Sequence, residues 1–274
     1  MKGSMQLEVD NLRVFAEKHR NPLKRYLSSK KTAAPVLNGI TNLFSGGVNL
    51  IVGPNRAGKS ILLRVLAGEV PVASGQIRID GVAVQSAALR RLIGYLPQQF
   101  GCYPQFNARE ILHYIALLKG LTDPGSREQE VETVLQQTDL LNVAQRQIGK
   151  YSQGMLQRVG IAQALLGNPP ILILDDPTAG IDPEARNRFR GKMTELGRNR
   201  IILWASSVVA DTAYADRVLV MDRGERRFWG TPAELAAAGV HRIVSRSLET
   251  GGQIEWLRKL EAGYCAILGC REEP

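Results

Sequence analysis

The chain has 274 residues, of which 44% are hydrophobic and 22% are charged. These values are typical of a globular protein of one to one and a half domains and exclude a disordered chain. No apolar run reaches the roughly 18 residues of a membrane-spanning helix, and the first residues lack the apolar stretch of a secretory signal. The three cysteines, Cys102, Cys265 and Cys270, show no metal-binding spacing and suit a reducing cytoplasm.

The formal net charge of +9 points to an anionic partner. Nucleic acid fits such a charge, and the anionic inner leaflet of a membrane fits it equally well. Part of the excess lies in residues 19–31. Residues 7–15 alternate as expected for a strand, and the basic residues 17–35 then form an insertion before the next element, at 36–40. We interpret this insertion as a solvated loop rather than a specific binding site.

Residues 53–60 fit the phosphate-binding loop pattern G-x-x-x-x-G-K-[ST] at every fixed position. An apolar run at 48–52 predicts a strand before the loop, and residues 61–67 predict a helix after it. In such a loop the backbone N–H groups point at phosphate oxygens, and the helix N-terminus adds partial positive charge. Lys59 is expected to reach the outer phosphates, and Ser60 to hold Mg²⁺. The predicted nucleotide-binding residues of the loop are Gly53, Pro54, Asn55, Arg56, Ala57, Gly58, Lys59 and Ser60.

The next elements alternate between strand and helix patterns. Residues 74–81 predict a short strand that closes in a turn, and residues 107–150 are mostly helical in pattern. Within them, Ser126 is expected to cap the second helix. Ser152 begins a further helix, and Gly154 leaves the backbone open to an incoming anion, which helix N-termini bind well. An ordinary cap on a core helix is the alternative interpretation.

An apolar run at 171–174 leads into Asp175 and Asp176. A buried strand that ends in an acid is typical of the Mg²⁺-binding aspartate of phosphate-loop NTPases, whose ligands sit at the carboxyl ends of strands. Asp175 is the expected metal ligand, and Asp176 is placed to orient or deprotonate a water. The sequence Asp-Asp-Pro-Thr also suits a β-turn, and both interpretations can hold. Later strands are predicted at 201–205 and 217–221, and a short helix from 231.

With these motifs in order, residues 7–235 resemble the nucleotide-binding subunit of an ATP-binding cassette (ABC) transporter. Residues 94–98 resemble the family's glutamine loop, residues 151–158 its signature, and residues 175–182 its second acidic motif and the loop that follows. The Tyr-Ser-x-Gly-Met form of the signature is similar to that of bacterial exporter subunits. The resemblance implies an α/β fold: a phosphate-loop NTPase core with a mostly parallel sheet, an antiparallel β subdomain and a helical subdomain at about 100–150. Residues 236–274 are then a C-terminal extension of unknown role.

The resemblance also implies ligands and partners. ATP and Mg²⁺ are the expected cofactors, with Gln98 sensing the metal or a water. Ser152 and Gly154 would face phosphates bound by a second nucleotide-binding subunit, in a homodimer or a heterodimer. A transmembrane permease would meet the chain near residues 100–106, which places it peripherally at the cytoplasmic face of the membrane. An aromatic residue near the first strand stacks on adenine in the family; Phe15 is the nearest candidate and Tyr26 the alternative.

Three positions depart from the family pattern. Arg56 replaces a glycine, and this cation either touches the nucleotide or points to solvent. Asp176 replaces a glutamate and is one methylene shorter, and small misplacements of a catalytic group can cost about a hundredfold in rate. The family's switch histidine is replaced by Ser207, judged by its spacing to Asp211, with Ser206 as the alternative. A serine cannot carry the positive charge that histidine can.

The predicted function is therefore an ATPase subunit that couples ATP binding and hydrolysis to transport through a transmembrane partner. The alternative is a degenerate, weakly hydrolysing regulatory cassette paired with an active one, which Asp176 and Ser207 favour. A nucleic-acid-acting ATPase is disfavoured, because such relatives tend to carry tandem cassettes or long coiled-coil insertions, and no specific nucleic-acid partner is expected. In the extension the pattern predicts a helix near 254–261 and a final strand that contains cysteine.

Overall fold

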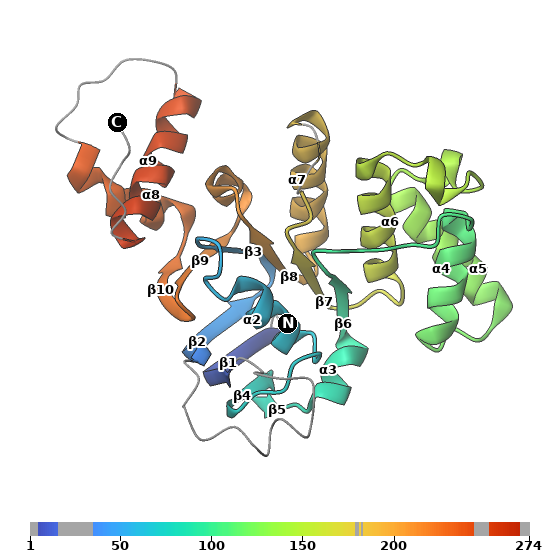
Figure 1. The fold of residues 1–274 in the computed structure, drawn as a ribbon, viewed down its shortest axis with the longest axis horizontal. Helices are drawn as coiled ribbons and strands as arrows, with labels where there is room; N and C mark the ends of the chain where they lie inside the picture. Colours follow the sequence, from blue (N-terminus) through green and yellow to red (C-terminus); the bar gives the residue numbers. More distant parts are fainter. Residues whose placement is uncertain (1–4, 16–34, 179–180, 182, 244–251, 269–274) are drawn as a thin grey trace, which may run out of the picture.

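The computed structural model describes residues 5–15, 35–178, 181, 183–243 and 252–268. The predicted basic insertion, except for its last residue, lies outside the described residues, as does Tyr26. Within the described part, the chain forms a six-stranded sheet, a four-stranded sheet, and helices grouped at two sides of the larger sheet (Figure 1).

The six-stranded sheet has the strand order β10-β9-β3-β8-β7-β6. All neighbours in it are parallel except β10, which pairs antiparallel with β9 at the edge. Its inner strands read as continuous apolar runs because helices cover both faces, and every residue of β7 and β8 is buried. The expected mostly parallel sheet is thus confirmed. The strands are β3 (Gly47–Val52), β6 (Ile93–Leu96), β7 (Ile171–Asp175), β8 (Ile201–Ser206), β9 (Arg217–Asp222) and β10 (Glu225–Gly230).

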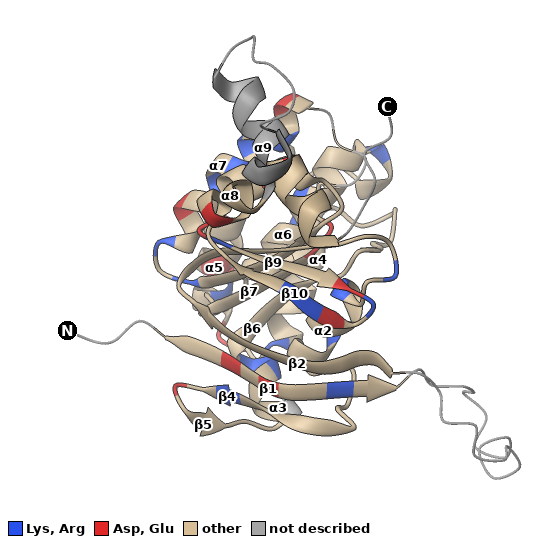
Figure 2. Cartoon of the chain, turned by 90° about the vertical axis from the view of Figure 1, so that its left-hand side faces the viewer, with Lys and Arg blue, Asp and Glu red and all other residues tan. Residues whose placement is uncertain are grey.

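The four-stranded sheet is antiparallel throughout, with the order β2-β1-β4-β5, as the resemblance implied. Figure 2 shows it as a separate layer below the larger sheet. Its apolar face shares one core with β3 and with α2, the helix after the phosphate loop, and Leu7, Phe44 and Leu62 are fully buried there. The elements are β1 (Gln6–Phe15), β2 (Pro35–Ser45), β4 (Ser74–Ile79), β5 (Val82–Ala83), α2 (Lys59–Leu66) and α3 (Ser86–Leu92).

The predicted helical subdomain packs beside the β6 edge of the larger sheet (Figure 1). Asn107 caps its first helix in a full capping box with Glu110. Ser126 does not cap the second helix, contrary to the prediction. Asp123 takes that role and accepts from the Ser126 N–H at 2.8 Å, because Pro124 at the first helical position starts the helix earlier. The elements are α4 (Ala108–Leu118), α5 (Pro124–Gln137), η1 (Leu141–Val143), η2 (Ile148–Lys150) and α6 (Gln153–Leu165).

Three further helices follow β7, β8 and β10 in the chain. The helix α7 (Pro183–Gly197) covers β8, where the rings of Phe189 and Trp204 meet edge to face with centroids 5.1 Å apart. A 3₁₀ helix, η3 (Val209–Tyr214), follows β8, and α8 (Pro232–Ile243) follows β10.

The C-terminal extension corrects another prediction. A single helix, α9 (Gly252–Leu268), includes the predicted helix near 254–261, but it also includes Cys265, so the predicted strand there is wrong. The helix packs side by side with α8, and a Cβ on Gly263 would lie 1.8 Å from the carbonyl oxygen of Leu235. Leu260 is fully buried in the same core as Leu235 of α8, and this packing favours a helix over a strand for the C-terminal segment. In the described part of the chain, no helix combines the length and apolarity needed to cross a membrane.

Candidate nucleotide site

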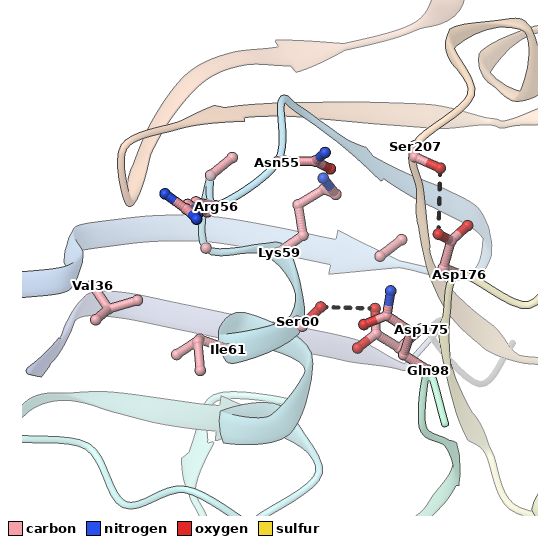
Figure 3. Close-up of a pocket in the computed structure, with 13 residues that line it drawn as sticks. Val36, Asn55, Arg56, Lys59, Ser60, Ile61, Gln98, Asp175, Asp176 and Ser207 are labelled. Carbon is pink, nitrogen blue, oxygen red and sulfur yellow. Dashed lines mark hydrogen bonds between the residues drawn. The ribbon is translucent and has the colours of Figure 1, made fainter. Parts of the chain in front are cut away.

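The phosphate loop connects β3 to α2, as its pattern predicts. Gly58 has a φ of 100°, which an L side chain rarely adopts, and a Cβ on Gly53 would lie 2.2 Å from the carbonyl oxygen of Met221. These glycines let the loop curl tightly against the neighbouring strand β9. Arg56 also has a positive φ, 68°, which explains why glycine is favourable at this position, and its side chain points away from Lys59 (Figure 3).

Lys59 lies folded into the centre of the loop. Its Nζ donates hydrogen bonds to the carbonyl oxygens of Gly53 at 2.7 Å and Pro54 at 3.2 Å. Burial lowers the pKa of Lys59, and the nearby carboxylates of Asp176 and Asp175 oppose that shift. The loop therefore already holds a cation beside its own backbone, at the N-terminus of α2.

Ser60 lies beside the acid at the end of β7. Its hydroxyl donates to Oδ1 of Asp175 at 3.1 Å, and burial raises the pKa of this carboxyl group, while the Ser60 hydrogen bond opposes the rise. Asp175 is only 4% exposed. A hydroxyl and a carboxylate in contact are hard oxygen ligands, and Gln98 lines the same cavity. The residues present therefore fit Mg²⁺.

Asp176 meets the residue that follows β8. Its Oδ2 accepts a hydrogen bond from the Ser207 hydroxyl at 3.3 Å (Figure 3), and its backbone N–H donates to the carbonyl oxygen of Ala205 at 2.9 Å. Ser206 is fully buried, and its hydroxyl donates to Asp211 at 2.6 Å instead. Ser207 therefore lines the cavity beside Asp176, whereas the alternative, Ser206, does not line it.

These groups line one cavity of about 370 Å³. Segments far apart in sequence converge on it: the phosphate loop, the segment after β6 and the ends of β7 and β8. Phe15 is not among its lining residues; it ends β1, pairs with Pro35 and is 47% exposed. Three lining residues, Val36, Ile61 and Ala205, were not predicted, because no motif marks them as part of the site. The lining residues are Val36, Asn55, Arg56, Ala57, Gly58, Lys59, Ser60, Ile61, Gln98, Asp175, Asp176, Ala205 and Ser207.

The signature residues lie in a separate hollow, which shares no lining residue with the first cavity. Ser152 caps α6 as predicted, and its Oγ accepts from the backbone N–H of Met155 at 3.3 Å. Ser152 and Gly154 line this hollow of about 360 Å³ together with Arg158 and Arg188. One chain therefore presents two anion-compatible surfaces that do not meet within it.

The fold and the first cavity define a phosphate-loop nucleotide-binding cassette. The family model described as "ABC transporter" matches residues 38–179. The chain belongs to the ABC transporter family.

Curated relatives agree with this membership. The chain is 35% identical over 215 residues to the "Probable multidrug ABC transporter ATP-binding protein YbhF" of Escherichia coli K12, which covers 77% of this chain and 37% of that protein. It is 38% identical over 186 residues to the "Uncharacterized ABC transporter ATP-binding protein YxlF" of Bacillus subtilis 168, which covers 68% of this chain and 62% of that protein. The chain thus spans only part of the length of these relatives.

Solved structures share the fold. The "Dimeric Structure of MJ0796, a Bacterial ABC Transporter Cassette" superposes with a TM-score of 0.70 at 20% identity, over 82% of this chain and 98% of that one. The ADP conformation of MJ1267, an ATP-binding cassette of an ABC transporter, gives a TM-score of 0.71 at 20% identity, over 88% and 96%. At these identities the likeness shows the ABC cassette fold alone.

Proposed function

We propose that this chain is the ATP-binding subunit of a membrane transport complex and couples ATP binding and hydrolysis to transport through a transmembrane partner. The observation that carries the proposal is the convergence of Lys59, Ser60, Gln98, Asp175 and Asp176 on one cavity from separate segments of the chain. This donor set combines a cation, metal ligands and a carboxylate free to act on water, as phosphoryl transfer requires.

Each residue has a chemical role in this proposal. Lys59 exchanges its bonds to the loop carbonyls for bonds to the outer phosphates. Ser60 and Asp175 would hold Mg²⁺, with Gln98 beside them, and the bound ion would neutralise charge on the phosphate oxygens. Asp176 accepts a hydrogen bond from the attacking water and orients it. Ser207 fixes the rotamer of that carboxylate through their hydrogen bond.

The assembly follows from the second hollow. We infer that Ser152 and Gly154 contact phosphates held by another nucleotide-binding subunit, so that two chains complete each site. The separate position of this hollow supports the inference, since Ser152 and Gly154 do not line the cavity of the phosphate loop of their own chain. A permease would then dock on the helical subdomain near Phe100, Tyr103 and Phe106, and hold the chain at the cytoplasmic face of the membrane.

The experiment is co-purification of the full chain with its membrane partner, followed by ATP titration and steady-state phosphate release. The proposal predicts ATP binding and phosphate release that stops when EDTA removes Mg²⁺. Absence of ATP binding, or phosphate release that is indifferent to EDTA, would contradict it.

The departures from the family pattern at Asp176 and Ser207 favour a finer proposal, that this site turns over slowly beside a more active one in an unlike subunit. The shorter acid reaches less well toward the attacking water, and the uncharged hydroxyl cannot supply the positive charge with which a histidine stabilises the reacting phosphate. Asp176→Glu combined with Ser207→His is then expected to raise phosphate release, and each tenfold gain lowers the barrier by about 1.4 kcal/mol. The two single variants are the controls. Fast wild-type turnover that the double change does not improve would refute slow turnover.

A further inference from the structure

A buried ion pair lies directly behind the turn that carries Ser207. Arg190 Nε donates to Oδ1 of Asp211 at 2.9 Å, and Arg190 Nη2 donates to the same oxygen. The Asp211 side chain is fully buried, and that of Arg190 is 11% exposed. The ring of Tyr214 covers the guanidinium, with its centroid 4.6 Å from Cζ. Because a charge pair so far removed from water must keep good geometry, it fixes the two elements that carry it.

Asp211 also holds the turn itself. Its other carboxylate oxygen, Oδ2, accepts from the Ser206 hydroxyl at 2.6 Å. The same Ser206 oxygen accepts from the backbone N–H of Val208 at 3.0 Å. Since Ser206 and Val208 flank Ser207, the backbone is fastened on both sides of the switch residue.

Together with the Ser207–Asp176 hydrogen bond, these contacts form a closed chain of interactions, the contact ring, that includes the catalytic carboxylate. Arg190 belongs to α7, the helix reached by the loop that starts at Asp176, whereas Asp211 belongs to η3, just after Ser207. The ion pair ties the two segments together at one end, and the Ser207–Asp176 hydrogen bond of 3.3 Å ties them at the other. The ion pair is buried and charge-assisted, whereas the hydrogen bond is long and exposed. Asp176 is held to β8 by its backbone N–H bond to the Ala205 carbonyl oxygen at 2.9 Å. The buried pair, through Ser206, therefore holds the orientation of the turn that brings the Ser207 hydroxyl to Asp176.

We propose that Asp211 and Arg190 are positioning residues for ATP hydrolysis, which hold the Ser207 hydroxyl against the Asp176 carboxylate. The proposal rests on the proposed function, in which this carboxylate orients the attacking water. Neither Asp211 nor Arg190 lines the nucleotide cavity, so both act through Ser207. Their loss should lower turnover and leave ATP affinity unchanged, because the phosphate loop lies outside the contact ring.

Two variants break the contact ring, one by removing a charge and the other by removing a single hydroxyl. Asp211→Asn keeps the shape of the side chain and removes its charge. Ser206→Ala keeps the ion pair and removes only the hydroxyl that fastens the turn, so it carries the test if Asp211→Asn does not fold. The matched control is Glu195→Gln, which removes a carboxylate from an exposed ion pair with Lys192 on the same helix.

The measurement is kcat per ATP-binding site and the Kd for ATP, for the full chain in its complex. Normalising to binding sites removes the effect of any unfolded fraction. Asp211→Asn and Ser206→Ala are each expected to lower kcat about tenfold, or about 1.4 kcal/mol, with a Kd within about twofold of the wild type. Glu195→Gln is expected to change neither quantity.

A double-mutant cycle separates positioning from general loss of stability. In a Ser207→Ala background, Asp211→Asn should have no further effect on kcat, because the group through which it acts is gone. An equal loss in both backgrounds, or an unchanged kcat in Asp211→Asn and Ser206→Ala, would overturn the positioning proposal alone. A wild-type complex that releases no phosphate would overturn the proposed function, and this proposal with it.

Discussion

Lys59→Met tests the nucleotide site most directly, because it removes the half-buried cation and keeps most of the side-chain stem. In the free protein, Nζ bonds the carbonyl oxygens of Gly53 and Pro54, and on ATP binding it exchanges these bonds for phosphate oxygens. The net loss on substitution is therefore about one charge-assisted hydrogen bond, or about 1.5–3 kcal/mol. That range corresponds to a loss of about 10- to 150-fold in ATP affinity.

Isothermal titration of the purified full chain with ATP measures the effect. Lys150→Met, at an exposed position outside the cavity, is the control and should bind ATP as the wild type does. The melting temperature of Lys59→Met is measured beside the affinity, because the variant also removes the Nζ bonds to Gly53 and Pro54. An ATP affinity unchanged by Lys59→Met would show that the phosphates bind elsewhere and refute the site.

Ser152→Arg is expected to leave ATP binding to one subunit within about twofold of wild type but to prevent an ATP-dependent dimer, because an incoming phosphate meets the new side chain at the α6 N-terminus. Size-exclusion chromatography in an Asp176→Asn background measures this, and a normal dimer would contradict the shared site. Gly94→Ala places a Cβ 1.9 Å from the carbonyl oxygen of Ala164, which forces α6 away from β6 and should lower the free energy of unfolding by about 1–3 kcal/mol. Urea denaturation measures this, and an unchanged urea midpoint would argue against that packing. Burial raises the pKa of the Cys102 thiol from 9.0 to about 11. Its thiolate fraction at pH 8 should therefore be about a hundredfold lower, and alkylation, followed by peptide mass spectrometry, should accelerate about tenfold per pH unit up to pH 11. Alkylation at pH 8 as fast as in the urea-unfolded chain would contradict this burial.

The phosphate loop and its flanking elements were predictable because their signal is local. Glycine at residues 53 and 58, an apolar run before them and a helical pattern after them determine strand, loop and helix without help from distant residues. The acids at the end of β7 were predictable in the same way, because they follow directly on an apolar run. The Ser152 cap was also predictable, because an N-cap acts within its own first turn. The predicted cap of α5, Ser126, was wrong. Pro124 starts the helix earlier, so Asp123 is its cap.

Tertiary contacts decided what local spacing left open. The spacing to Asp211 predicts Ser207 at the switch position and leaves Ser206 as the alternative. In the structure the buried carboxylate of Asp211 accepts from the Ser206 hydroxyl, and Ser207 faces Asp176. Arg190, which anchors that carboxylate, carries no motif that could reveal its role.

The C-terminal segment shows the same limit. The pattern around Cys265 was compatible with a strand, but the close approach of Gly263 to Leu235 and the burial of Leu260 make it a helix on α8. By itself, the sequence determined each element that depends on interactions between residues close in the chain: the nucleotide-binding loop, the strand that ends in the two acids, and the helix that begins at the signature. Only the tertiary structure decided which distant segments pair, because burial and ion pairing depend on faces that come together after the elements have formed.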